Sequence, residues 1–162
     1  MAAQTTYGFS TPKGVPGGLY DISYHEVNTR MNEEEDGKLG FGVGVVHGTN
    51  KGHTVKLPAT GSTANEFEGV TIYGVTVEHD MTGNVVIRKN TTVGVVRTGK
   101  VWVKVATGIE PAYNAKLYLI TTGSEAGCFT NASGANAIEI KGKFIGEVDN
   151  GIAPVLLPNE VN

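Results

Sequence analysis

The residues that this sequence has little of already exclude several classes of protein. Among 162 residues there is one cysteine, Cys128, so the chain cannot form an internal disulfide. It also lacks neighbouring Cys or His residues that would complete a zinc site, and this cysteine usage fits a reducing compartment. No apolar run approaches the roughly 20 residues that cross a bilayer, and the first residues lack the regions of a signal peptide. We therefore expect no membrane partner, and a protein that acts where it is made or is released by lysis.

Charged residues are also scarce. The 13 basic and 16 acidic side chains give a net charge of -3, and charged residues make up 18% of the chain. There is no run of Lys or Arg that could neutralise a row of phosphates, which nonspecific binding to nucleic acid requires. With 40% hydrophobic residues, the composition is too apolar for a disordered chain. The sequence predicts a folded protein with no nucleic-acid partner.

Helical patterns are the third feature that is missing. Gly occurs 23 times and Pro 6 times, and in a helix interior Gly costs roughly 1 kcal/mol and Pro roughly 3 kcal/mol. No stretch carries apolar residues at helical spacing without a glycine or a β-branched cluster, so only short helical turns are expected, at 65–68 and 110–114. The sequence therefore predicts an all-β protein, a single antiparallel β-sandwich or jelly-roll-like barrel with an extended N-terminal arm.

The expected strands are separated by turn signals at short intervals. The clearest runs from Lys100 to Val105, where valines alternate with Lys100, Trp102 and Lys104. Hairpin loops are expected at 82–84 and 98–100, the second joining two antiparallel strands. The expected strands are 20–25, 39–46, 53–57, 67–78, 85–88, 92–98, 100–106, 116–121, 137–141, 144–147 and 153–157.

The first nineteen residues predict an arm (1–19) in front of a β domain (20–162). Its prolines and glycines exclude both a helix and a central strand. Apolar residues are nevertheless spaced along it, which a purely flexible tail does not need. We expect deletion up to Pro16 to leave the domain folded and to weaken binding to a partner. The candidate contact residues of the arm are Phe9, Val15, Pro16 and Leu19.

A glycine-rich strand supplies a second set of candidates. Gly40, Gly42 and Gly44 alternate with apolar residues and leave one strand face as bare backbone, which invites the close approach of another backbone or a large side chain. In a chain without a catalytic site, this face is a candidate contact between subunits. Trp102, on the more polar face of its strand, is a further candidate.

Motifs for catalysis or cofactor binding are incomplete. Residues 94–100 have the spacing of a phosphate-binding loop, but no Ser or Thr follows the lysine and a strand, not a helix, is expected next. The acidic cluster 33–36 lacks the alternate spacing of a calcium loop and predicts a solvated loop. The spacing of the four histidines fits no metal motif. The sequence thus predicts no catalytic residue, no metal and no cofactor, and a protein that is not an enzyme.

Five segments, taken in their order along the chain, carry a resemblance to a known family. The segments are GFGVGVVHG at 40–48, VKLPATG at 55–61, FEGVTIYGVTVEHD at 67–80, the stretch from VVRTGKVWVKV to GCFT at 95–130, and KGKFIGEVDNGIAPVLLPN at 141–159. Their order resembles that of the structural cement, or capsid decoration, proteins of tailed bacteriophages.

This resemblance implies a noncatalytic, β-rich protein on the outer surface of an icosahedral phage head. There it would bridge neighbouring subunits of the phage major capsid protein and stabilise the shell, as a homodimer or homotrimer made in the cytoplasm of the bacterial host. The resemblance carries over no catalytic or ligand residue. Two alternatives remain open: another virion β module, such as a head fibre, tail or baseplate protein, and a carbohydrate-binding β-sandwich with Trp102 and Tyr118 as its aromatic residues.

Overall fold

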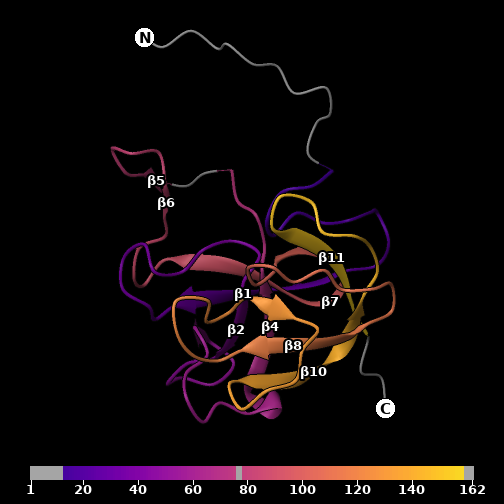
Figure 1. Cartoon of the computed structure of the whole chain (residues 1–162). Coiled ribbons are helices and arrows are strands. Elements are labelled where there is room, and N and C mark those ends of the chain that lie inside the picture. The colour runs from indigo at the N-terminus through magenta and orange to yellow at the C-terminus, as the bar shows by residue number, and fades with distance from the viewer. Residues whose placement is uncertain (1–12, 76–77, 159–162) are drawn as a thin grey trace, which may run out of the picture.

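The computed structural model describes residues 13–75 and 78–158 (Figure 1). In this part of the chain it contains eleven strands and one short 3-10 helix, so the predicted all-β class is confirmed. The helical turn expected at 65–68 is present as the 3-10 helix, whereas 110–114 form no helix. The elements are β1 (Glu26–Asn32), β2 (Gly44–His47), β3 (Thr54–Lys56), η1 (Ala64–Glu66), β4 (Phe67–Thr71), β5 (Glu78–His79), β6 (Val85–Val86), β7 (Thr92–Lys104), β8 (Lys116–Ile120), β9 (Phe129–Thr130), β10 (Ala137–Phe144) and β11 (Ile152–Leu157).

Five strands of the N-terminal half close into a ring. The strand order is β1-β3-β2-β4-β7, and β7 pairs in turn with β1. All of these pairings are antiparallel except the one between β1 and β3. Closure leaves no strand edge open within the ring, which removes a route to edge-to-edge aggregation. The ring surrounds a small core of Leu39, Phe41, Val43, Val45, Val55, Ile87, Val93 and Val95.

The second half of the chain builds another set of strands on the same β7. The order continues β7-β11-β10-β8-β9, and β9 returns to the end of β7 through a bridge between Val105 and Phe129. The amide of Ala106 donates to the carbonyl of Phe129 at 2.9 Å. The core of this half is larger and is formed mainly by the buried residues Val101, Val103, Leu117, Leu119, Phe129, Ile140, Phe144, Ala153, Val155 and Leu157. The protein therefore has two apolar cores that share one long strand.

The shared strand contradicts the hairpin expected at 98–100. β7 runs without interruption for 13 residues, pairing with β1 in its first half and with β11 in its second. Gly99 has a φ of 123°, and a Cβ there would lie 2.4 Å from Cδ2 of His25. Glycine is needed at this position because the chain before β1 packs directly against β7. The chain does not turn at Gly99.

We expect Gly99→Ala to lower the free energy of unfolding by about 2 kcal/mol. The added methyl group meets the His25 ring, and the backbone angle at Gly99 disfavours any L side chain. Urea denaturation measures the change. Gly134→Ala is the matched control, because a Cβ there meets no heavy atom within 4 Å; equal destabilisation by the two substitutions would contradict the assigned role of Gly99.

Several expected strands are shorter than predicted or absent, among them β3, β6 and the strand expected at 144–147, of which only Phe144 lies in a strand, the end of β10. Residues 20–25 form no strand, because the side chain of Asp21 accepts the amide of Ser23 and turns the chain. The glycine-rich segment becomes β2 only from Gly44, since Gly42 has a φ of 70°. The segment expected at 67–78 leaves the sheet after Thr71. By contrast, the hairpin expected at 82–84 is confirmed, and Figure 1 shows its strands, β5 and β6, standing apart from the rest.

Candidate interaction surface

The described part of the arm is docked on β7. The amide of Gly17 donates to the carbonyl of Trp102 at 2.7 Å, and the amide of Trp102 donates to the carbonyl of Gly18 at 2.9 Å. Two residues further, the amide of Tyr20 donates to the carbonyl of Lys100 at 3.0 Å. The arm thus occupies the side of β7 that β11 leaves free in this half. From Gly17 onward its backbone is fixed by sheet-type hydrogen bonds.

Trp102 lies beneath this arm. Its side chain is 5% exposed, Gly14 is in close contact with the indole, and the ring of Tyr20 lies 5.7 Å away between centroids. A carbohydrate platform requires an exposed aromatic face. Trp102 packs against its own chain instead, so the feature that favoured a carbohydrate-binding protein is not present. Tyr118, the other aromatic residue of that alternative, is half-buried on β8.

The bare glycine face is also filled from within the chain. A Cβ on Gly42 would lie 2.7 Å from the amide nitrogen of Gly17 and 3.0 Å from Pro16, and one on Gly44 would lie 2.4 Å from Leu119. A Cβ on Gly40 would lie 3.3 Å from Nζ of Lys104. The close approach predicted from these glycines therefore exists, but it joins the arm and the two halves of one molecule.

Several apolar side chains of the arm remain exposed. Tyr73 lies beside the arm, because its amide donates to the carbonyl of Gly17 at 2.9 Å, and its ring is half-exposed. Phe9 lies outside the described residues, and Pro16 is half-buried against Gly42. We use the name arm face for these half-exposed residues taken together: Val15, Leu19, Tyr20 and Tyr73.

The acidic cluster 33–36 folds back onto the protein. The carboxylate of Glu33 accepts the amide of Thr49 at 2.8 and 2.9 Å, and that of Glu34 accepts the amide of Leu57 at 3.0 Å. Hydrogen bonds from the Thr54 hydroxyl and the Thr49 amide hold the pKa of Glu33 below its usual range. These two carboxylates fasten the cluster to the segments on either side of β3.

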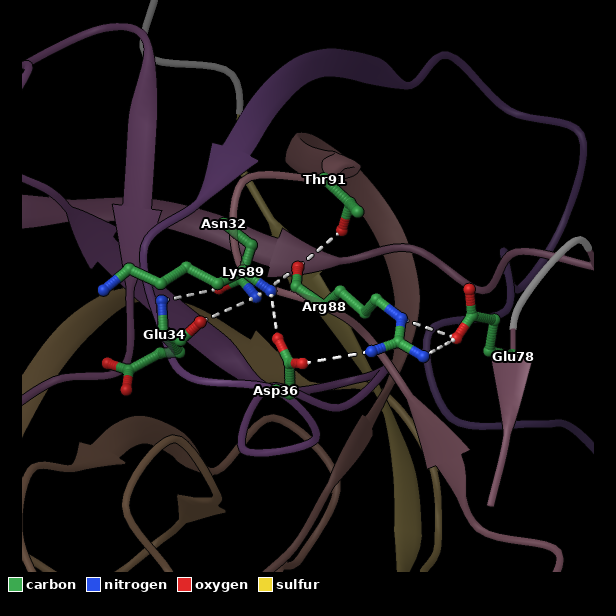
Figure 2. A network of polar contacts seen from close by, with 7 residues as sticks. All are labelled: Asn32, Glu34, Asp36, Glu78, Arg88, Lys89 and Thr91. Carbon is green, nitrogen blue, oxygen red and sulfur yellow. Dashed lines mark hydrogen bonds and ion pairs between the residues drawn. The ribbon is translucent and has the colours of Figure 1, made fainter. Parts of the chain in front are cut away.

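Asp36 and Arg88 extend this polar network to the β5–β6 hairpin (Figure 2). Arg88 lies between two carboxylates, with Nη2 2.7 Å from Glu78 and Nη1 3.2 Å from Asp36. Asp36 also accepts the amide of Lys89 at 2.8 Å. The ion pairs are more than half exposed, so they contribute orientation rather than much stability.

Residues 33–36 do lie in a loop, and Glu35 and Asp36 are exposed, as expected for a solvated loop, but the sequence did not indicate their bonds to the rest of the chain. Glu35 pairs with Lys38 at 2.9 Å, so each of the four carboxylates has a partner within the chain. In the described residues, no group of three or more His, Cys, Asp or Glu could hold a metal ion. The acidic residues act as structural hydrogen-bond acceptors.

Comparison with known proteins shows which family the chain belongs to. Residues 3–157 match the family described as structural cement protein (E217 gp24/Pam3 gp6). The chain belongs to this family of phage cement proteins. A solved chain from "The capsid of Myoviridae Phage XM1" has the same fold, with a TM-score of 0.79 and 19% identity over 98% of this chain and 99% of that one. No curated protein matches.

The cement protein thus has a capsid cement or decoration role and associates with the capsid shell of a virion. Its family is one of structural phage proteins. Within the described ranges no helix is long and apolar enough to span a membrane. The single cysteine of the cement protein is half-buried, and this burial raises the pKa of the Cys128 thiol.

A cavity between the two halves of the cement protein does not select a ligand class. It has a volume of about 450 Å³. Its lining mixes three acidic residues with two basic ones, so no single class of charged ligand is clearly selected; the charged residues are Glu26, Glu68, Glu139, Arg97 and Lys141. Interaction through surfaces suits this chain better than binding of a small molecule.

Two features of the cement protein were not indicated by the sequence. Tyr73 lies within the strand expected at 67–78, and nothing in the local pattern predicts that it lies beside the arm. Asn32 is fully buried at the end of β1 and connects the acidic cluster to the chain before β7. Both depend on contacts between distant segments, which a single sequence does not reveal.

Proposed function

We propose that the cement protein binds the outer surface of the phage head as a homodimer or homotrimer. In that position it bridges neighbouring subunits of the major capsid protein and stabilises the shell without catalysing a reaction. Membership of the cement family supports attachment to the capsid. The arm face supports the mode of attachment, since it presents apolar side chains on a backbone that is already hydrogen-bonded to β7.

The arm face is the observation that carries this proposal. Val15, Leu19, Tyr20 and Tyr73 remain half-exposed although much of the surrounding chain is packed. Neighbouring apolar groups of this kind mark interaction surfaces in soluble proteins. Because the backbone is preordered, binding a partner there costs less conformational entropy than ordering a free tail. An oligomer that engages several capsid subunits gains further by effective concentration.

Binding to shells that lack the cement protein tests the proposal. The purified wild-type chain is expected to saturate such shells at many copies per particle and to raise the temperature at which they release DNA. Leu19→Ser is expected to weaken binding by about tenfold, because it removes an apolar group of the arm face. Val27→Ser is the matched control, since Val27 on β1 is equally exposed, at 43%.

The outcomes separate the parts of the proposal. Failure of the wild-type chain to decorate shells would overturn capsid attachment. Occupancy of only a few copies per particle would indicate a head-fibre, tail or baseplate protein. Light scattering after size-exclusion chromatography measures the subunit number, and a monomer that still saturates shells would exclude the homodimer and homotrimer.

A further inference from the structure

The loop from Asp21 to Tyr24, which joins the arm to β1, is held rigidly by a few side chains. Oδ1 of Asp21 accepts the amide of Ser23 at 2.9 Å and also its hydroxyl, which forms a tight turn. Oδ2 of the same carboxylate pairs with Nζ of Lys100 at 2.6 Å, and both side chains are two-thirds buried. The turn is therefore closed internally and tied to β7.

The two ends of this loop are fixed at the same place on β7. The carbonyl of Lys100 accepts the amide of Tyr20 at 3.0 Å and lies 3.0 Å from Nε2 of His25. The ring of His25 and the carbonyl of Tyr24 lie over Gly99, where no side chain obstructs them. With both ends and the turn held, the loop is preformed before any partner binds.

The preformed loop presents its apolar residues to solvent. Ile22 is fully exposed, at 105%, and Tyr24 is 71% exposed. The fold gains nothing from burying either side chain, yet the surrounding contacts hold them outward in a defined direction. A rigid apolar residue surrounded by small polar ones has the character of an interface anchor.

Charge and shape indicate the kind of partner. The only charge in the loop, on Asp21, is neutralised by Lys100, so the tip is apolar and uncharged. An exposed single side chain on a tight turn is convex, and two such tips do not complement each other across a two-fold axis. The loop therefore fits a concave apolar site on a different surface.

We propose that the Ile22 loop, residues 21–24, inserts Ile22 into an apolar depression of the major capsid protein, with Tyr24 packing at the rim. This inference rests on the proposed function, because the family associates with the capsid shell. It adds a second contact element, distinct from the arm face, and assigns the specific recognition to a preformed loop. Asp21 and Lys100 are positioning residues for this contact.

Four substitutions with matched exposures test the inference. Ile22→Ser and Tyr24→Ser are compared with Met81→Ser and Tyr113→Ser, because Met81 is 106% exposed and Tyr113 is 70% exposed. Binding of each variant to shells that lack the cement protein is measured by co-sedimentation. We expect Ile22→Ser to raise the Kd about tenfold and Tyr24→Ser about threefold, with the two controls within about twofold of wild type. Circular dichroism and Trp102 emission confirm that each variant is folded.

A fifth variant tests the rigidity of the loop. Asp21→Ala retains the Ile22 side chain but removes the turn and the ion pair that hold it. This variant is expected to weaken binding by about threefold. If wild type binds the shells and Ile22→Ser binds them equally well, this inference is overturned and the proposed function remains intact. Failure of wild type itself would overturn the proposed function. A change in the molar mass of free Ile22→Ser would show that the loop contacts a second copy of the chain, which also overturns the inference.

Discussion

Asn32→Leu is expected to lower the free energy of unfolding by about 3 kcal/mol. Asn32 is fully buried, and its side-chain oxygen accepts the amide of Glu34 at 2.9 Å. Its side-chain nitrogen donates to the carbonyls of Arg88 and Glu34, at 3.1 and 3.3 Å (Figure 2). Leucine has a similar volume but no polar atoms, so three partly buried backbone hydrogen bonds to the side chain are lost. The substitution keeps the backbone bonds of residue 32 to Thr91 and Asn90.

Urea denaturation of the free protein measures this loss. Asn131→Leu is the control, because Asn131 is exposed and the same change in composition is made outside the network. The control is expected to stay within about 0.5 kcal/mol of wild type. If the two variants were equally stable, Asn32 would not be the connection between the acidic cluster and the chain before β7.

The strands that the sequence predicts well are those in which apolar residues alternate simply with polar or aromatic ones. Residues 100–105 alternate valine with larger polar or aromatic groups, and residues 100–104 form the second half of β7. Gly99 misleads because a glycine between two strands is the usual signal of a turn. Its actual role follows from the ring of His25, which is far away in the sequence and arrives only through folding.

The candidate interaction surface could likewise be predicted only in part from the sequence. Spaced apolar residues in the arm indicate docking, and Val15 and Leu19 do lie on a docked backbone. The alternation at 20–25 marks Ile22 and Tyr24 as one face of a strand, whereas the Asp21 turn converts the same residues into an exposed loop. Burial of Trp102 could not be predicted, since it depends on where the arm lies.

The position of the arm also changes what truncation should do. Deletion up to Pro16 was expected to spare the fold, but Gly14 covers the indole of Trp102 and Gly17 bonds to the backbone of β7. Residues 13–18 therefore belong to the packing of the domain. Comparing a chain that lacks residues 1–12 with one that lacks residues 1–18 isolates their contribution.

We expect the chain lacking 1–18 to be less stable than the chain lacking 1–12 by about 4 kcal/mol. Uncovering Trp102 exposes on the order of 150 Å² of apolar surface, which accounts for most of this difference at roughly 25 cal/mol per Å². The hydrogen bonds between Gly17, Gly18 and Trp102 are lost as well. Urea denaturation gives the difference, and the emission of the single tryptophan is expected to shift to longer wavelength only in the shorter chain. Equal stability and equal emission of the two truncated chains would show that the arm contributes nothing to the fold, and would leave attachment to the capsid as its sole role.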